Sequence, residues 1–230
     1  ASDVYTRQAR YRAAAMSDSD TSRAPDQRPV IVVGILAVLV LAGVAAVAQI
    51  SELSIEDLTR DPADVADETY FIGVLSQLGG LIWMTTAAVT LLAASLVWQR
   101  GDRPTARFLG VFGAITLVLT IDDVFLVHER FWPHAIGAPE FLLIGTYAVV
   151  TAGALWAFRR QLADGRLGVL VAALGFFAGS VLIDRFTQDN ESPPYFLEDS
   201  LKFLGIVAWA FYFVDRSRRE LLNAPTPSDD

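Results

Sequence analysis

The chain has 230 residues, 53% of them hydrophobic, and a formal net charge of −8 at pH 7. It contains no cysteine, which excludes disulfides, thiolate metal ligands and a cysteine nucleophile. With only two histidines, His128 and His134, a metal site built mainly from imidazoles is disfavoured. The long apolar runs favour a membrane protein, with the lipid bilayer and not nucleic acid as its expected partner.

The N-terminal stretch 1–28 is polar and carries five arginines among serine, aspartate and proline residues. This composition predicts a disordered tail, because it offers little apolar surface to bury. Met16 offers an alternative start, in which case residues 1–15 would lie outside the native chain. No signal peptide is visible before Pro29. A second polar tail is expected at 216–230.

Six apolar segments follow the first tail, each close to the length of about 20 residues that crosses a hydrocarbon core. They predict an all-α fold: a polytopic integral membrane protein in which a bundle of six transmembrane helices forms one domain, 29–215. The predicted spans are 29–50, 73–98, 108–128, 140–158, 167–186 and 196–214.

The positive residues are distributed unevenly between the two ends of this bundle. If both termini are cytoplasmic, the tails and the two inner turns hold 14 of the 18 positive residues. The opposite side then holds four positive residues against 16 acids. Because cytoplasmic loops carry an excess of arginine and lysine, the sequence predicts a multi-pass protein of the cell inner (plasma) membrane with cytoplasmic N- and C-termini.

The stretch 117–130, LVLTIDDVFLVHER, places two adjacent aspartates, Asp122 and Asp123, inside an apolar run. An ionised side chain in lipid costs about 2.5–3.5 kcal/mol on insertion scales, so we expect these carboxylates to have a function. The outer ends of two other spans carry charges at a similar depth, namely Asp184 in the fifth and Glu198, Asp199 and Lys202 in the sixth. The pattern predicts one polar site shared by three helices.

Helical geometry predicts how some of these residues pair. Asp122 and Glu129 are seven residues apart and would share a face of a continuous helix. His128 would lie about 120° from that face and would reach the site only if the helix bends or ends nearby. Glu198 and Lys202 have i, i+4 spacing with the acid first, which favours an ion pair within the sixth span.

Two kinds of chemistry fit a site dominated by carboxylates. Oxygen ligands favour a divalent cation such as Ca²⁺, Mg²⁺ or Mn²⁺, and a metal-bound water could attack a lipid. Paired carboxylates could instead act as acid and base or carry protons. The predicted catalytic residues are Asp122, Asp123, Asp184 and Asp199; the predicted metal ligands are Asp122, Asp184 and Asp199; the residues expected to bind or orient a substrate are Glu198, Lys202 and His128.

The leading functional hypothesis is a membrane-embedded enzyme, for example a metal-dependent hydrolase, that acts on a lipid or other hydrophobic substrate near the outer leaflet. A proton- or cation-coupled transporter or channel could use the same carboxylates. In a third interpretation the protein is a non-catalytic membrane subunit whose ion pairs hold the helices together. The sequence leaves the oligomeric state open.

Overall fold

A computed structural model describes residues 28–222 of the protein, apart from 52, 61, 70, 164–165 and 187–191. The described residues form helices and no strand, which confirms the predicted all-α class. Most of the two predicted tails lies outside the described residues. The chain divides into two compact units, 1–72 and 73–230, which are considered separately.

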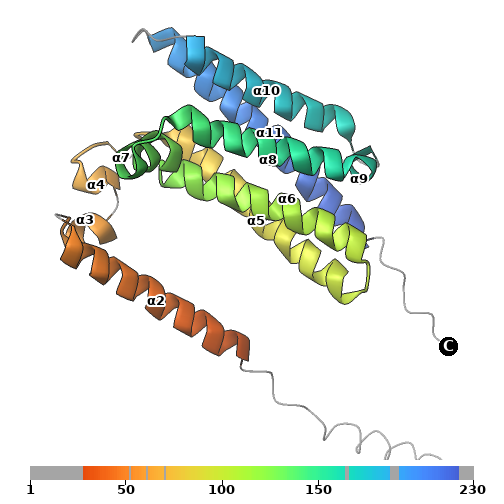
Figure 1. The fold of residues 1–230 in the computed structure, drawn as a ribbon, viewed down its shortest axis with the longest axis horizontal. Helices are drawn as coiled ribbons and strands as arrows, with labels where there is room; N and C mark the ends of the chain where they lie inside the picture. The colour runs from red at the N-terminus through yellow and green to blue at the C-terminus, as the bar shows by residue number, and fades with distance from the viewer. Residues whose placement is uncertain are drawn as a thin grey trace, which may run out of the picture. The chain divides into compact units, whose positions relative to one another are not determined.

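The described residues of the first unit form one long helix and two short ones (Figure 1). These are α2, Arg28–Ile50; α3, Ile55–Thr59; and α4, Pro62–Val65. The side chains of α2 are predominantly apolar and exposed from Ile31 onward, as expected of a helix surrounded by lipid. Ser54 and Asp57 cap α3 reciprocally, because each accepts a hydrogen bond from the backbone N–H of the other, at 3.1 and 2.8 Å.

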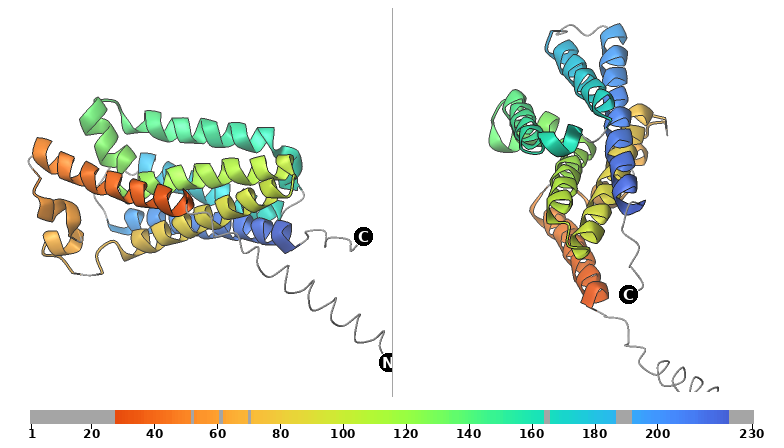
Figure 2. Two further views of the ribbon diagram at one scale, coloured as in Figure 1. Left: turned by 90° about the horizontal axis from the view of Figure 1, so that it is seen from below. Right: turned by 90° about the vertical axis from the view of Figure 1, so that its right-hand side faces the viewer.

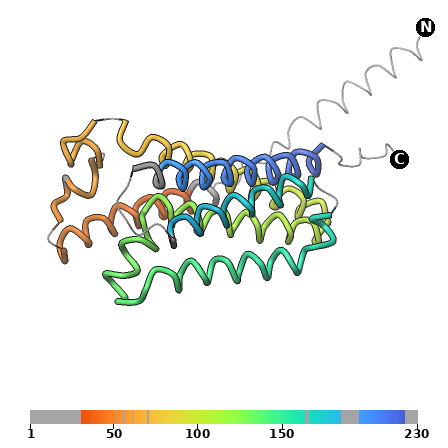
Figure 3. Tube along the Cα trace, turned by 90° about the horizontal axis from the view of Figure 1, so that it is seen from above, coloured from red at the N-terminus to blue at the C-terminus, as the bar shows by residue number. Residues whose placement is uncertain are grey.

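The second unit is built around four long helices. These are α5, Val74–Gln99; α6, Arg103–Val124; α10, Leu167–Phe186; and α11, Ser192–Leu222. α5 packs against α6 and α11, and α10 packs against α11 (Figures 1 and 2). The helix α8, Glu140–Ala157, makes few contacts with this group and runs along its edge (Figure 3).

Close packing between these helices depends on two glycines. A Cβ at Gly113 of α6 would come within 2.8 Å of the Leu91 side chain on α5. A Cβ at Gly205 of α11 would come within 2.7 Å of the Phe177 ring on α10. Glycine therefore lets both helix pairs approach more closely than any other residue would allow.

Aromatic side chains fill the core of the second unit. Phe108, Phe112, Trp209 and Phe213 are at most 1% exposed, and their contacting rings have centroids 4.7–6.2 Å apart. Aromatic pairs of this kind contribute about 0.5–1.5 kcal/mol each beyond their burial. The indole N–H of Trp209 donates to the hydroxyl oxygen of Thr116 at 3.0 Å, so its one polar group is satisfied. These rings form an apolar cluster between α6 and α11, called the aromatic layer below.

Five of the described helices are long and apolar enough to cross a membrane. They cover Ile31–Ile50, Val74–Gln99, Arg103–Val124, Glu140–Ala157 and Leu167–Asp184, and they correspond to the first five predicted spans. α11, at the predicted sixth span, does not meet the same criterion because it carries charges towards both ends. Its uncharged stretch 203–214 would cover only about 18 Å of a hydrocarbon core about 30 Å thick.

α11 also extends beyond the predicted end of the last span. It continues to Leu222, into the stretch predicted as a tail. Two ion pairs at i, i+4 spacing support these additional turns: Asp215 with Arg219 at 3.2 Å, and Arg216 with Glu220 at 2.8 Å.

Candidate functional site

A break in the backbone after α6 shapes the candidate site. α6 ends at Val124, so the prediction of a continuous span to residue 128 is wrong. Leu126 adopts a left-handed conformation, with φ 50° and ψ 43°, which costs about 1–2 kcal/mol for a residue with a Cβ. A π-helical turn, η1 (Val127–Phe131), and a short helix, α7 (Trp132–Ile136), follow. Strained backbone and π turns concentrate at functional sites, which directs attention to this segment.

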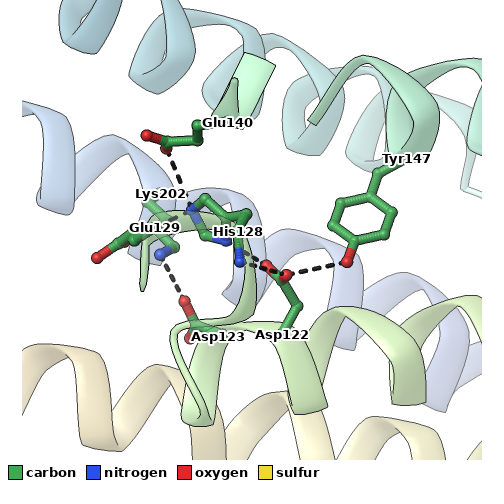
Figure 4. Close-up of polar contacts among 7 residues, drawn as sticks. All are labelled: Asp122, Asp123, His128, Glu129, Glu140, Tyr147 and Lys202. Atoms are coloured by element: carbon green, nitrogen blue, oxygen red, sulfur yellow. Dashed lines mark hydrogen bonds and ion pairs between the residues drawn. The ribbon is translucent and has the colours of Figure 1, made fainter. Parts of the chain in front are cut away.

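The break allows the chain to turn back onto Asp122, which is 5% exposed. The Asp122 Oδ1 accepts hydrogen bonds from the backbone N–H of His128 at 3.1 Å and from the Tyr147 hydroxyl at 2.9 Å. The Asp122 Oδ2 contacts Nδ1 of the His128 ring (Figure 4). Because an ionised carboxylate only accepts, Nδ1 carries the proton in this contact. Three donors thus compensate for the removal of one carboxylate from water.

His128 connects this buried carboxylate to carboxylates nearer the surface. Its side chain is 15% exposed, and Nε2 lies 3.5 Å from Oε1 of Glu129 and 3.7 Å from Oε1 of Glu140. Burial favours the neutral imidazole, but the hydrogen bond and charge of Asp122, together with the charge of Glu129, outweigh burial and raise the pKa of His128 above its ordinary value. A ring with Nδ1 held by a carboxylate and Nε2 turned outward can accept and return a proton.

Because α6 breaks at this site, the predicted assignment of residues to helix faces is wrong here. The sequence predicts Asp122 and Glu129 on one face, with His128 about 120° away. Instead His128 contacts Asp122 directly, and Glu129 approaches Nε2 on the other side of the ring. A face assignment holds only while a helix continues, and α6 has already ended at Val124. The condition under which His128 could join the site, a helix end nearby, is therefore met.

Lys202 pairs with a different carboxylate from the one predicted. Its Nζ lies 2.5 Å from Oδ1 of Asp123, and the ion pairs of the described residues do not include Glu198 with Lys202. The Asp123 side chain is 9% exposed, against 34% for Lys202. Asp123 lies about 100° around α6 from Asp122, so it faces α11 while Asp122 faces the returning chain. The lysine thus compensates the more buried acid, where an unpaired charge would be most costly.

A small cavity of about 20 Å³ lies beside this ion pair. It is lined by Leu75, Ser76, Gly79, Asp123, Asp199, Lys202, Phe203 and Ile206. A volume of this size holds about one water molecule. The cavity can therefore hydrate the ion pair, and a substrate would have to approach the site from the surface.

The predicted metal ligands are not brought together. Asp122 is buried, whereas Asp184 and Asp199 are both exposed. Within the part of the chain that the structure describes, no three histidine, aspartate or glutamate side chains are arranged to hold a metal ion. The prediction of a shared ligand set on three helices finds no support, because the similar depths of these residues do not make their carboxylates converge.

The other acids at this end still form one electrostatic region. Asp184 on α10 acts electrostatically on Glu140 of α8 and on Glu198 of α11. Asp199 acts in the same way on Glu198 and Lys202. Asp184 and Asp199 therefore add negative charge to the site through Glu140, Glu198 and Lys202.

Two residues of the site, Glu140 and Tyr147, were not among the predicted site residues. Both belong to α8 and lie seven residues apart, so they share a face of that helix. This spacing is the one signal in the sequence that could have identified them. Tyr147 holds Asp122 from the side opposite η1, and Glu140 faces His128 (Figure 4).

The described residues thus define an all-helical protein with five membrane-length apolar helices and a carboxylate–imidazole pair at one end of the bundle, consistent with a membrane protein. The chain belongs to the family described as a domain of unknown function, DUF8692, whose model matches residues 31–215. This match includes the candidate site. No curated protein and no solved structure matches the chain.

Proposed function

We propose that this protein is a membrane-embedded enzyme that uses Asp122 and His128 for acid–base catalysis on a lipid or another hydrophobic substrate. The observation that carries the proposal is the contact of the buried Asp122 with Nδ1 of His128, which leaves Nε2 turned outward. In this arrangement Asp122 fixes the tautomer of the ring and stabilises its charged form. His128 then takes a proton from the bound substrate at Nε2 and returns it to the product.

The surroundings of the pair support a hydrophobic substrate. Phe125, Phe131 and Phe141 flank the break and are 59–70% exposed. Large apolar side chains beside charged groups are typical of a surface that faces lipid chains and headgroups together. A substrate with an apolar chain could therefore reach His128 from the bilayer.

The proposal assigns the chemistry to an imidazole instead of a divalent cation. A Ca²⁺, Mg²⁺ or Mn²⁺ ion would need several oxygen ligands around it. Asp122 is already bound by the backbone and ring of His128 and by Tyr147, and these donors would compete with a metal for its lone pairs. The remaining predicted ligands, Asp184 and Asp199, do not converge on it.

A lipid-conversion assay tests the enzymatic proposal. Wild-type protein and variants are reconstituted in vesicles of a polar lipid extract, and the lipids are followed by mass spectrometry. We expect His128→Gln to lower the rate of conversion by about 10²–10⁴-fold, the usual contribution of a general acid–base group.

His134→Gln is the matched control for this assay. His134 is exposed, and its Nδ1 contacts the backbone oxygen of Arg130 at 2.8 Å, so its loss should leave conversion unchanged. If the wild type converts no lipid, or if His128→Gln converts lipid as fast as the wild type, the proposal is wrong.

A proton-coupled transporter is the second candidate. Buried hydroxyls of Thr120 and Thr116 continue inward along the face of α6 that carries Asp123, which would suit proton movement. The aromatic layer, including Phe112 and Trp209, interrupts this line before the other end. Proton uptake into dye-loaded vesicles that Asp122→Asn abolishes, without lipid conversion, would favour transport over catalysis. If the protein shows neither proton uptake nor lipid conversion, a non-catalytic subunit is favoured.

We also propose that α11 is a sixth span and that both termini are cytoplasmic in the plasma membrane. The ion pair between Lys202 and Asp123 supports the sixth span, because it compensates a charge near the start of α11. The excess of arginines at the ends of α5, α8 and α11 supports the orientation.

Single cysteines test this topology, since the chain has none of its own. Asp64→Cys should react with an impermeant reagent added to intact cells, whereas Arg107→Cys should react only after permeabilisation. Both positions are exposed, so burial would not explain a failure to label. Labelling of Arg107→Cys but not Asp64→Cys in intact cells would show that the orientation is the reverse of the proposed one. Labelling of both would show that the two positions lie on the same side, so that the topology has one span fewer than proposed.

A further inference from the structure

The end of the second unit opposite the candidate site carries two arginines placed over tryptophans. The guanidinium carbon of Arg103 lies 3.6 Å from the centre of the Trp98 ring, and that of Arg159 lies 4.6 Å from the Trp156 ring. In both cases the tryptophan belongs to the last turn of a membrane-length helix, and the arginine follows that helix end. The same arrangement therefore occurs at the ends of α5 and α8. We call these two the Arg–Trp pairs.

Both Arg–Trp pairs are accessible from outside the protein. Trp98 is 47% exposed and Trp156 is 71% exposed, and the two arginines are exposed as well. Tryptophan at the end of a membrane-length helix sits at headgroup depth, because its ring is largely apolar and carries one polar N–H. A guanidinium over that ring is then held at the same depth, next to lipid phosphates.

The charges of the two stacked arginines are not compensated by carboxylates of the described residues. Among the acids at this end, Asp215 pairs with Arg166 and Arg219, and Glu220 pairs with Arg216. Asp102 caps the first turn of α6 by accepting from the backbone N–H of Thr105. The ion pairs of the described chain include neither Arg103 nor Arg159.

We infer that the Arg–Trp pairs bind the headgroups of anionic phospholipids. A guanidinium presents several N–H donors in a plane and binds a phosphate group with two of them, and stacking on a ring fixes its position beforehand. The uncompensated positive charge selects a lipid with net negative charge over a zwitterionic one. This inference concerns the opposite end from the acid–base site and does not depend on catalysis there.

Lipid retention measured by native mass spectrometry tests the inference. The full-length protein in detergent is mixed with phosphatidylglycerol or with phosphatidylcholine of the same chains, and the bound lipids are counted. We expect the wild type to retain phosphatidylglycerol preferentially. Arg103→Gln with Arg159→Gln should weaken this retention by about fivefold for each arginine removed, and by about 25-fold together. Added salt should reduce the preference of the wild type.

Arg60→Gln is the charge-matched control, because Arg60 lies in the first unit and pairs with Asp64 on α4. It should retain phosphatidylglycerol as the wild type does. Trp98→Leu with Trp156→Leu keeps both charges but removes the stacking, and it should lose part of the preference. Equal retention of both lipids by the wild type, or undiminished retention of phosphatidylglycerol by the double arginine variant, would overturn the inference.

Discussion

Replacing Lys202 by methionine is expected to lower the free energy of unfolding by about 3 kcal/mol. The variant leaves Asp123, whose side chain is 9% exposed, without its ion-pair partner beside a cavity that holds about one water. Breaking a buried pair costs about 3–5 kcal/mol, and the lower end applies because 34% of the Lys202 side chain is exposed. Denaturant or thermal unfolding in one detergent measures the loss.

Two further variants identify the partner of Lys202. Adding Asp123→Asn to Lys202→Met removes both charges and should recover most of the lost stability. Glu198→Gln, at the position predicted from i, i+4 spacing, should change stability by less than about 1 kcal/mol. If Glu198→Gln costs as much as Lys202→Met, or if the double variant recovers nothing, the interhelical pair does not stabilise the bundle.

The helices could be predicted from the sequence because lipid imposes a simple length rule. A run of about 20 apolar residues bounded by arginine or proline fixes a helix with little reference to its neighbours. The predicted spans 73–98, 140–158 and 167–186 agree with α5, α8 and α10 to within one residue at either end. The exceptions are α6 and α11. The end of α6 depends on Leu126 in a left-handed conformation, which the residue type does not favour.

The residues of the site could be predicted only in part. Asp122 and Asp123 stand out because carboxylates are rare within apolar runs. Their partners depend on contacts that sequence spacing does not determine. The Tyr147 hydroxyl donates to Asp122, which lies 25 residues earlier in the sequence. Within a predicted span, a tyrosine cannot be distinguished from the other largely apolar residues. The pairing of Lys202 with Asp123 instead of Glu198 depends likewise on the rotation of α11 against α6.

Replacing Asp122 by alanine is expected to have the largest effect on stability, a loss of about 3–5 kcal/mol. The variant leaves three donors without an acceptor in a buried position: the backbone N–H and the ring of His128, and the hydroxyl of Tyr147. Asp122→Asn keeps the shape and one acceptor oxygen, so its loss should be smaller, about 1–3 kcal/mol. Asp184→Ala is the control, because this exposed aspartate should change stability by less than about 0.5 kcal/mol.

The pH dependence of the Asp122 variants separates the ion pair with His128 from simple loss of packing. The pKa of folded His128 is raised above its ordinary value of 6.5, because Asp122, with a smaller contribution from the charge of Glu129, outweighs burial. A raised pKa means that the pairing stabilises the protein fully below pH 6.5, and that this contribution is lost as the pH rises through the raised value. The difference in stability between wild type and Asp122→Asn should therefore be largest in mild acid and shrink in alkali. A difference that stays constant across this range would show that Asp122 holds the fold without stabilising a charged imidazole, and the acid–base role of His128 would lose its physical basis.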